Sequence, residues 1–314
     1  MISRVLAVVV LAGVLPIPAP GQQSRERPPV IDVHLHAPMR PGEIDEYRDN
    51  LEADLEEIDA FNVRHVVLTG VPNILFAWQD GIDDHVGVIP SLLFPCENGV
   101  VVMWGRPCFE GGADWPDLEW LRDEIEAGRI QALGEITTQF LGLSPSGAEF
   151  DPYFALAAEY DLPVFIHMGP GYPGGGYPST GADLVTPKYR AALANPLLLE
   201  EALSRYPTVR VAVVHSGWPM ADEMVATLYH HPQVYAEVGL LQTTSLFPRE
   251  EYYAFLGRLV RAGFGDRILF GSDASLAAGV DAVLEAEFLK EQQKRDILCG
   301  NAARFLRLDG AVCR

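Results

Sequence analysis

Two histidines stand one residue apart at the end of an apolar run, in the stretch VIDVHLHAP at residues 30–38. Side chains two residues apart in an extended strand point to the same side, so the imidazoles of His34 and His36 should lie together. Imidazole nitrogen is a ligand of zinc, manganese and iron in many proteins. Taken alone, the pair fits a metal site and also fits two half-buried histidines that bond nearby carbonyls.

Four further ionisable residues close apolar runs elsewhere in the chain. They are Glu135, His167, His215 and Asp273. Burying such a group at the end of a strand is costly unless a partner compensates it. Four imidazoles and two carboxylates around a cation would supply that compensation. The set predicts a divalent metal centre, with zinc as the first candidate and manganese or iron as alternatives.

Eight short β-rich runs must position these residues, and they alternate with helical patterns. The runs cover residues 30–36, 65–70, 86–93, 130–136, 163–168, 210–216, 234–239 and 267–273. Most are continuously apolar, which is typical of parallel strands covered on both faces. Eight β-then-α units predict a single-domain (β/α)8 TIM barrel, an α/β fold whose active site forms at the carboxyl ends of the strands. A doubly wound sheet is the alternative, but no Gly-rich phosphate loop follows the first run.

Amphipathic segments fill the intervals between these runs. Apolar residues from Ile44 to Ile58 recur at steps of three and four, which gives a helix one apolar stripe. Further helices are predicted at 117–128, 197–207 and 250–263. The remaining histidines begin or precede apolar runs, so they should lie at the opposite end of the barrel from the metal centre. These are His65, His85, His230 and His231.

Two long insertions follow the third and fifth runs, and a barrel would place both at its mouth as lids. They cover residues 94–115 and 169–196. Segments this long without regular structure usually carry function or are disordered. The candidates for substrate contact are Tyr172 and Tyr177 for stacking, Lys188 and Arg190 for a carboxylate, and Trp218 as a pocket wall. Surface positions without substrate contact explain the loop residues equally well.

The first residues have the pattern of an export signal. Arg4 precedes an apolar run at residues 5–15, and small residues lead to Gly21. The run is too short to span a bilayer, which takes about 20 residues. We therefore expect a signal peptide at 1–21, a mature domain at 22–314, and a periplasmic or secreted protein.

The cysteines and the charge fit an exported protein that acts on small molecules. Cys96 and Cys108 form one near pair and Cys299 and Cys313 another, so we expect these two disulfides, although spacing alone does not fix the connectivity. The formal charge of −20 argues against nucleic-acid or anionic-membrane partners. A small-molecule substrate is expected, and a homo-oligomer is compatible with the sequence.

The order of the six ionisable residues resembles the amidohydrolase superfamily. It has H-x-H on the first strand, a carboxylate on the fourth, histidines on the fifth and sixth, and aspartate on the eighth. The segments NPLLLEEALSRYPTVRVAVVHSG at 195–217 and ILCGNAARFLRL at 297–308 resemble its amidohydrolase-2 branch of metal-dependent hydrolases and decarboxylases. The likeness covers nearly the whole mature chain.

The resemblance implies a role for each residue. His34, His36 and Asp273 would hold one metal ion, and His167 and His215 would hold a second. Superfamily members bridge two ions with a carboxylated lysine or a glutamate on the fourth strand, and this sequence has Glu135 there. With Asp273 as proton acceptor, the implied reaction is hydrolysis of an ester, lactone or amide by a metal-activated water.

Two other functions are compatible with the same residues. A non-oxidative decarboxylase or hydratase of an aromatic or unsaturated acid would carry one ion, and His215 would be its acid or base. An exported metal-binding barrel without catalysis is the other alternative. The complete set for activating water, including Asp273, argues against the second of these.

Overall fold

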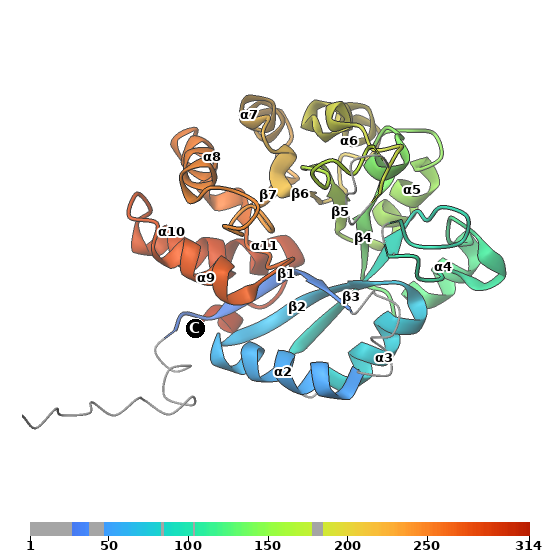
Figure 1. Cartoon of the computed structure of the whole chain (residues 1–314), viewed down its shortest axis with the longest axis horizontal. Coiled ribbons are helices and arrows are strands. Elements are labelled where there is room, and N and C mark those ends of the chain that lie inside the picture. The colour runs from blue at the N-terminus through green and yellow to red at the C-terminus, as the bar shows by residue number, and fades with distance from the viewer. Residues whose placement is uncertain (1–26, 38–46, 83–84, 103, 178–184) are drawn as a thin grey trace, which may run out of the picture.

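The computed structural model describes residues 27–37, 47–82, 85–102, 104–177 and 185–314, with the backbone alone for 47–53. The signal peptide predicted at 1–21 and the helix start predicted at Ile44 lie outside the described residues. Helices surround a sheet of parallel strands (Figure 1). In that view α2 (Tyr47–Ala60) and α3 (Pro72–Ile82) cover one side of the sheet, and α6 (Glu200–Arg205) and α7 (Ala221–His230) lie on another.

The strands pair in the order of the sequence, each parallel to the next. They are β1 (Val30–His36), β2 (Val63–Gly70), β3 (Gly87–Phe94), β4 (Ala132–Ile136), β5 (Val164–His167), β6 (Val211–Val214), β7 (Val234–Glu237) and β8 (Ile268–Leu269). Two backbone hydrogen bonds join the last strand region to the first. Val33 donates to the carbonyl of Phe270 at 3.1 Å, and Asp273 donates to the carbonyl of His34 at 2.8 Å. The predicted (β/α)8 TIM barrel is confirmed.

Helices follow the strands as the apolar periodicity predicted. Besides the four helices named above, the structure contains α4 (Leu118–Glu126), α5 (Asp151–Tyr160), α8 (Arg249–Arg261), α9 (Leu276–Leu284), α10 (Glu291–Arg295) and α11 (Asn301–Leu306). The predicted helix at 117–128 is α4, which begins where the Asp117 carboxylate accepts from two backbone N–H groups. It ends before Gly128, whose φ is 73°. None of the described helices is long and apolar enough to span a membrane.

The described residues form two apolar clusters. One lies between the strands and the helices outside them, and it includes Val30, Leu133 and Trp78. The other lies inside the barrel, where Ile31 and other strand residues pack against α11. The burial of strand residues on both faces explains why the strands read as continuous apolar runs.

Strands β1 and β4 each contain one extra residue relative to their neighbours. Asp32 pairs with Val66 and Leu35 with Leu68, so β1 advances three residues while β2 advances two. On β4, Leu133 and Ile136 are likewise three residues apart but face positions of β3 and β5 that are two apart. An extra residue of this kind reverses the face that the following side chains occupy.

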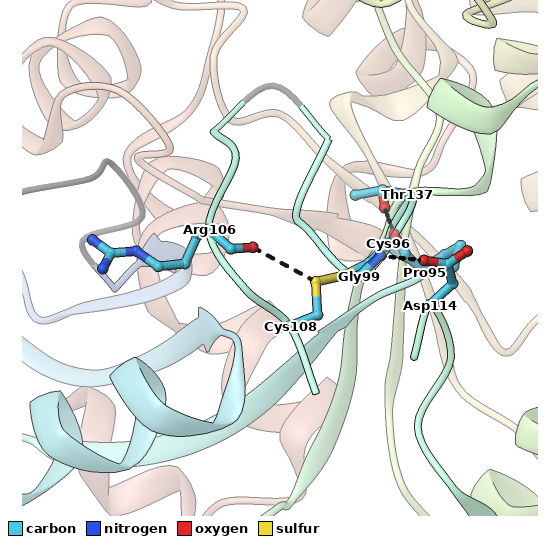
Figure 2. The surroundings of a disulfide bond; sticks show 7 residues. All are labelled: Pro95, Cys96, Gly99, Arg106, Cys108, Asp114 and Thr137. Atoms are coloured by element: carbon cyan, nitrogen blue, oxygen red, sulfur yellow. Dashed lines mark hydrogen bonds between the residues drawn. A yellow bond between two sulfur atoms is a disulfide. The ribbon is translucent and has the colours of Figure 1, made fainter. Parts of the chain in front are cut away.

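Both expected disulfides are present, Cys96–Cys108 and Cys299–Cys313. Figure 2 shows the first, at the base of the loop that follows β3. The Gly99 N–H donates to the Asp114 carboxylate at 2.7 Å, and the Thr137 hydroxyl donates to the carbonyl of Pro95 at 2.9 Å. The disulfide and these bonds tie the loop to itself and to the end of β4.

Candidate active site

The six predicted residues meet at the carboxyl ends of the strands. A cavity of about 520 Å³ opens there, and five of the six line it, namely His36, Glu135, His167, His215 and Asp273. The sixth, His34, is 2% exposed and lies against His36 with a distance of 3.0 Å between their Nε2 atoms. The structure thus brings together the whole set that the sequence predicted as metal ligands.

The extra residues in β1 and β4 explain how these side chains reach the interior. Ile31 and Val33 already face the inside of the barrel, so strict alternation would turn His34 and His36 outward. The irregularity after Asp32 restores the inward direction. On β4 the same correction falls at Gly134, where φ is 146° and an added Cβ would lie 2.6 Å from Phe165. Glycine is therefore required beside Glu135.

One group of donor atoms has the spacing of a four-ligand metal site. The Nε2 atom of His34 lies 3.8 Å from Glu135 Oε2 and 3.7 Å from Asp273 Oδ1. The Nε2 atom of His36 lies 3.6 and 3.3 Å from the same two oxygens. Ligands about 2.1 Å from a tetrahedral ion are roughly 3.4 Å apart. The measured separations scatter around that value.

The second group lies on the other oxygen of Glu135. Its Oε1 atom is 2.6 Å from Nδ1 of His167 and 3.6 Å from Nε2 of His215. Donor atoms of these three residues all lie within 4.8 Å of one another. Glu135 therefore stands between two imidazole pairs and presents one oxygen to each.

The charges of the site fit a cation. Burial lowers the pKa of His34, but the neighbouring carboxylates, with Asp273 foremost, outweigh it and raise that pKa well above its usual value. Burial raises the pKa of Glu135, but the imidazoles, led by His167, hold it well below its usual range. Buried carboxylates that stay ionised next to imidazole nitrogens are the donor set of a divalent metal centre.

Glu237, at the end of β7, lies against two of the histidines of the donor cluster. Its side chain is fully buried and accepts the backbone N–H of His215 at 3.0 Å. It also lies 3.5 Å from Nδ1 of His34. The Nδ1 atom of His215 lies 2.9 Å from the carbonyl of Gly239. A proton on Nδ1 of His215, donated to this carbonyl, leaves its Nε2 lone pair free to face the donor cluster.

Two of the site residues have left-handed backbones, with φ 58° at His215 and 55° at Asp273. Such a conformation is strained for a residue other than glycine and persists where neighbours hold it. The Glu237 carboxylate holds the His215 N–H, and the carbonyl of His34 holds the Asp273 N–H. The buried Asp32 carboxylate also accepts from the N–H groups of His34 and Ser272, at 3.0 and 2.9 Å. These bonds fix both ends of the donor cluster.

Above the donor cluster the cavity wall is apolar. Trp104 lies with its ring centre 5.3 Å from that of His36, and Phe140 lies 4.5 Å from His167 by the same measure. Trp218 and Tyr172 also line the cavity, and their contact with a substrate stays a prediction. Trp104, Phe140 and Phe247 were not singled out from the sequence, because aromatic residues in loops carry no signal of direction.

Three other residues suggested for substrate contact do not line this cavity. Tyr177 is 70% exposed. Lys188 forms an ion pair with Glu97 at 2.6 Å, and Arg190 donates to the carbonyls of Pro187 and Tyr189 at 3.0 and 2.8 Å. The substrate contact expected of them stays a prediction, and the geometry gives it no support, because Lys188 is paired with a residue of the loop after β3 and Arg190 with carbonyls of its own loop.

The root of the loop after β5 is held by Gln139. Its side chain accepts the N–H of Gly169 and donates to the carbonyl of the same residue, both at 3.1 Å. The Tyr189 hydroxyl donates to that carbonyl at 2.6 Å. The loop is thereby fixed beside His167, although a lid movement of this loop and of the loop after β3 stays a prediction.

The comparisons with known proteins agree with this geometry. The model of the amidohydrolase-2 family, described as Amidohydrolase, matches residues 106–308, which is more than half of the chain. The chain therefore belongs to the amidohydrolase family, and it is an enzyme with a candidate metal-ligand group at the mouth of its barrel. No curated protein matches the chain in sequence.

Solved structures share the fold at low sequence identity. An uncharacterised TIM-barrel protein from Bordetella bronchiseptica is 16% identical, with a TM-score of 0.61 over 89% of this chain and 98% of its own. An amidohydrolase from Burkholderia multivorans is 13% identical, with a TM-score of 0.58 over 89% and 99%. The 5-carboxyvanillate decarboxylase from Sphingomonas paucimobilis is 12% identical, with a TM-score of 0.58 over 90% and 99%.

Proposed function

We propose that this enzyme is a hydrolase that cleaves an ester, lactone or amide with water, and that Glu135 bridges two divalent ions. The position of Glu135 supports this most strongly. One of its oxygens faces His34 and His36, and the other faces His167 and His215. A carboxylate between two imidazole pairs can neutralise part of the repulsion between two cations.

Each residue then has a definable task. His34, His36 and Asp273 would hold the first ion, and His167 with His215 the second, with zinc as the first candidate. Ions bound there would supply a Lewis acid and lower the pKa of water toward 7. Asp273, whose Oδ2 lies 3.9 Å from His215 Nε2, would accept a proton from the attacking water and deliver it to the leaving group. The apolar wall would keep bulk water from the reacting carbonyl.

A decarboxylase or hydratase with one ion is the second candidate. A decarboxylase is among the proteins that share this fold, and fold likeness alone does not separate the two reactions. In that enzyme Glu135 would not be a bridge, and His215 would serve as the acid or base.

Export from the cytoplasm is part of the proposal. Two disulfides on a chain of this size are typical of an oxidising compartment. The apolar run at 5–15 behind Arg4 has the composition of a signal peptide. N-terminal sequencing of the mature protein from its own host should begin near residue 22.

The hydrolase is tested by metal removal and return. Chelated protein should lose activity against a panel of aryl esters, lactones and anilides, and zinc or manganese should restore it. His167→Gln should remain inactive after metal return. His230→Gln is the matched control, because His230 ends α7 at the opposite end of the barrel. Wild-type activity that survives chelation, or decarboxylation of aromatic acids without any hydrolysis, would contradict the proposal.

A further inference from the structure

We propose that the substrate is an uncharged, largely apolar acyl compound that has no free carboxylate away from the scissile bond. This inference rests on the proposed hydrolysis and adds the chemical class of the substrate. It follows from three observations: the cavity wall is apolar, no described lysine or arginine lines it, and Lys188 and Arg190 of the nearby loop have partners elsewhere.

The cavity wall is built from aromatic and aliphatic side chains. They are Trp104, Phe140, Trp218, Leu240, Leu246 and Phe247. They come from loops after β3, β4, β6 and β7, so apolar surface meets a bound molecule from several sides of the barrel. Trp218 and Phe247 pack edge to face with ring centres 4.9 Å apart, which fixes one part of this wall.

No lysine or arginine is among the residues that the structure describes around this cavity. Among the described lining residues outside the donor cluster, Glu251 alone is charged, and it is exposed at the start of α8. A substrate carboxylate far from the ions would lose its hydration, gain no cationic partner from the described part of the wall, and face this acidic side chain. Burial of an unpaired charge is strongly unfavourable.

The cations in the loop after β5 do not change this conclusion. The Lys188 ammonium lies 2.6 Å from the Glu97 carboxylate, and the Arg190 guanidinium donates to two carbonyls of its own loop. The Lys188–Glu97 pair links the loop after β5 to the loop after β3. Neither residue lines the cavity.

The donor cluster itself suits a neutral carbonyl. Glu135 and Asp273 would offset much of the charge of two divalent ions, and the buried Glu237 lies behind His34. The remaining positive charge is confined to the place where the scissile carbonyl would bind. The cavity volume of about 520 Å³ lies within the usual range for small-molecule sites and would hold an aromatic or branched acyl compound.

The test compares matched substrates on the metal-loaded full-length mature protein. Each pair consists of an uncharged aryl ester, lactone or anilide and the same compound with one carboxylate distant from the scissile bond. We expect kcat/KM to be roughly 10- to 100-fold higher for the uncharged member, given the cost of burying an unpaired polar group.

Two arginine variants locate the cause of this preference. Leu246→Arg adds a cation to the cavity wall and should reduce the preference at least severalfold, mainly by lowering KM for the carboxylated member. Leu118→Arg is the matched control, because Leu118 is 37% exposed against 44% for Leu246 and does not line the cavity. It should leave the preference unchanged, and circular dichroism should show both variants folded.

The outcomes separate this inference from the function on which it rests. Equal or faster cleavage of the carboxylated members overturns the substrate class and leaves the hydrolase standing. An unchanged preference in folded Leu246→Arg overturns the role of this wall. Metal-loaded protein that cleaves no member of any pair contradicts the hydrolase itself, and the substrate class falls with it.

Discussion

The two ends of the barrel are built from opposite kinds of side chain. At the carboxyl ends of the strands, buried histidines and carboxylates surround a cavity. At the amino ends, α11 closes the barrel with apolar residues, and Phe305 packs against Phe165 and Tyr235 with ring centres 5.6 and 4.9 Å apart. The first end holds groups that are expensive to bury, and the second contributes the apolar packing that stabilises the fold.

Each end also carries one disulfide of similar loop length. Cys96–Cys108 closes the loop that bears Trp104, and Cys299–Cys313 ties the C-terminal segment beneath the barrel. The sequence separations are 12 and 14 residues, so similar losses of loop-closure entropy are expected. If removal of the two disulfides changes activity to different extents, the difference must then come from where each disulfide lies in the barrel.

The largest expected effect is a loss of activity on substitution of a carboxylate at the mouth of the barrel. Asp273→Asn removes a carboxylate that lies 3.3 Å from His36 and would accept the proton, so kcat/KM should fall by roughly 10²- to 10⁴-fold. Thermal unfolding should show that the variant is folded. Asp222→Asn is the control, because Asp222 lies on the surface of α7 in an ion pair with Arg258. Full activity in Asp273→Asn would remove Asp273 from the mechanism.

A stability effect of comparable size is expected at the closed end. Phe305→Ala leaves a cavity among the aromatic rings beneath the barrel and should lower the free energy of unfolding by about 3–5 kcal/mol. The kcat of the fraction that remains folded should be unchanged. Phe288→Ala, at a ring that is 42% exposed, should cost far less. A loss of kcat without a loss of stability in Phe305→Ala would break the contrast between the two ends.

Removal of each disulfide in turn tests the contrast between the mouth and the closed end of the barrel more closely. The double variants Cys96→Ser with Cys108→Ser, and Cys299→Ser with Cys313→Ser, should each lower the free energy of unfolding by about 3 kcal/mol. Only the first should raise KM for apolar substrates, by severalfold, because only that loop carries a wall residue of the cavity. Equal KM values in denaturant-free assays of both variants would show that the disulfide does not position Trp104.

The smallest expected effect is on stability, and it concerns Asp54 on helix α2, outside the barrel and between its two ends. Burial, with a contribution from Glu57, raises the pKa of Asp54 to about 6 from 3.8. A carboxyl with a raised folded pKa favours the folded state while it is protonated. That contribution is lost as pH rises from about 4 through 6.

Asp54→Asn should therefore stabilise the protein at pH 7.5 by about 1 kcal/mol, a value reduced for solvent screening, and should have little effect at pH 4. Chemical unfolding at both pH values measures this difference. Asp59→Asn is the control on an exposed position of the same helix. A stabilisation that is equal at both pH values would contradict the assignment to Asp54.

The sequence predicted site residues best where the residue is an ionisable type that is unfavourable to bury without a partner. Ionisable residues at the ends of apolar runs predicted His34, His36 and Glu135 as partners, and the structure brings them together. The fold followed from the regular alternation of strands and helices. The extra residues in β1 and β4 were not predictable, because the alternation of strands and helices in the sequence does not show where the pairing register between neighbouring strands changes.

The cavity wall and the orienting groups were harder to foresee. Trp104 and Phe247 reach the cavity only because their loops fold back over the barrel. The role of Glu237 depends on its distances to His215 and His34, which lie on other strands. Lys188 and Arg190 were expected near a substrate because of their loop, but Lys188 pairs with Glu97 of another loop and Arg190 with a carbonyl of its own loop.

The central claim is that Glu135 bridges two metal ions, and metal content tests it most directly. Wild-type protein saturated with zinc, freed of excess metal and measured by mass spectrometry should hold about two ions per chain. Glu135→Gln should lose most of both ions together with hydrolysis, and His230→Gln should retain both. A wild-type content of about one ion per chain, left unchanged by Glu135→Gln, would contradict the bridged site and favour the decarboxylase.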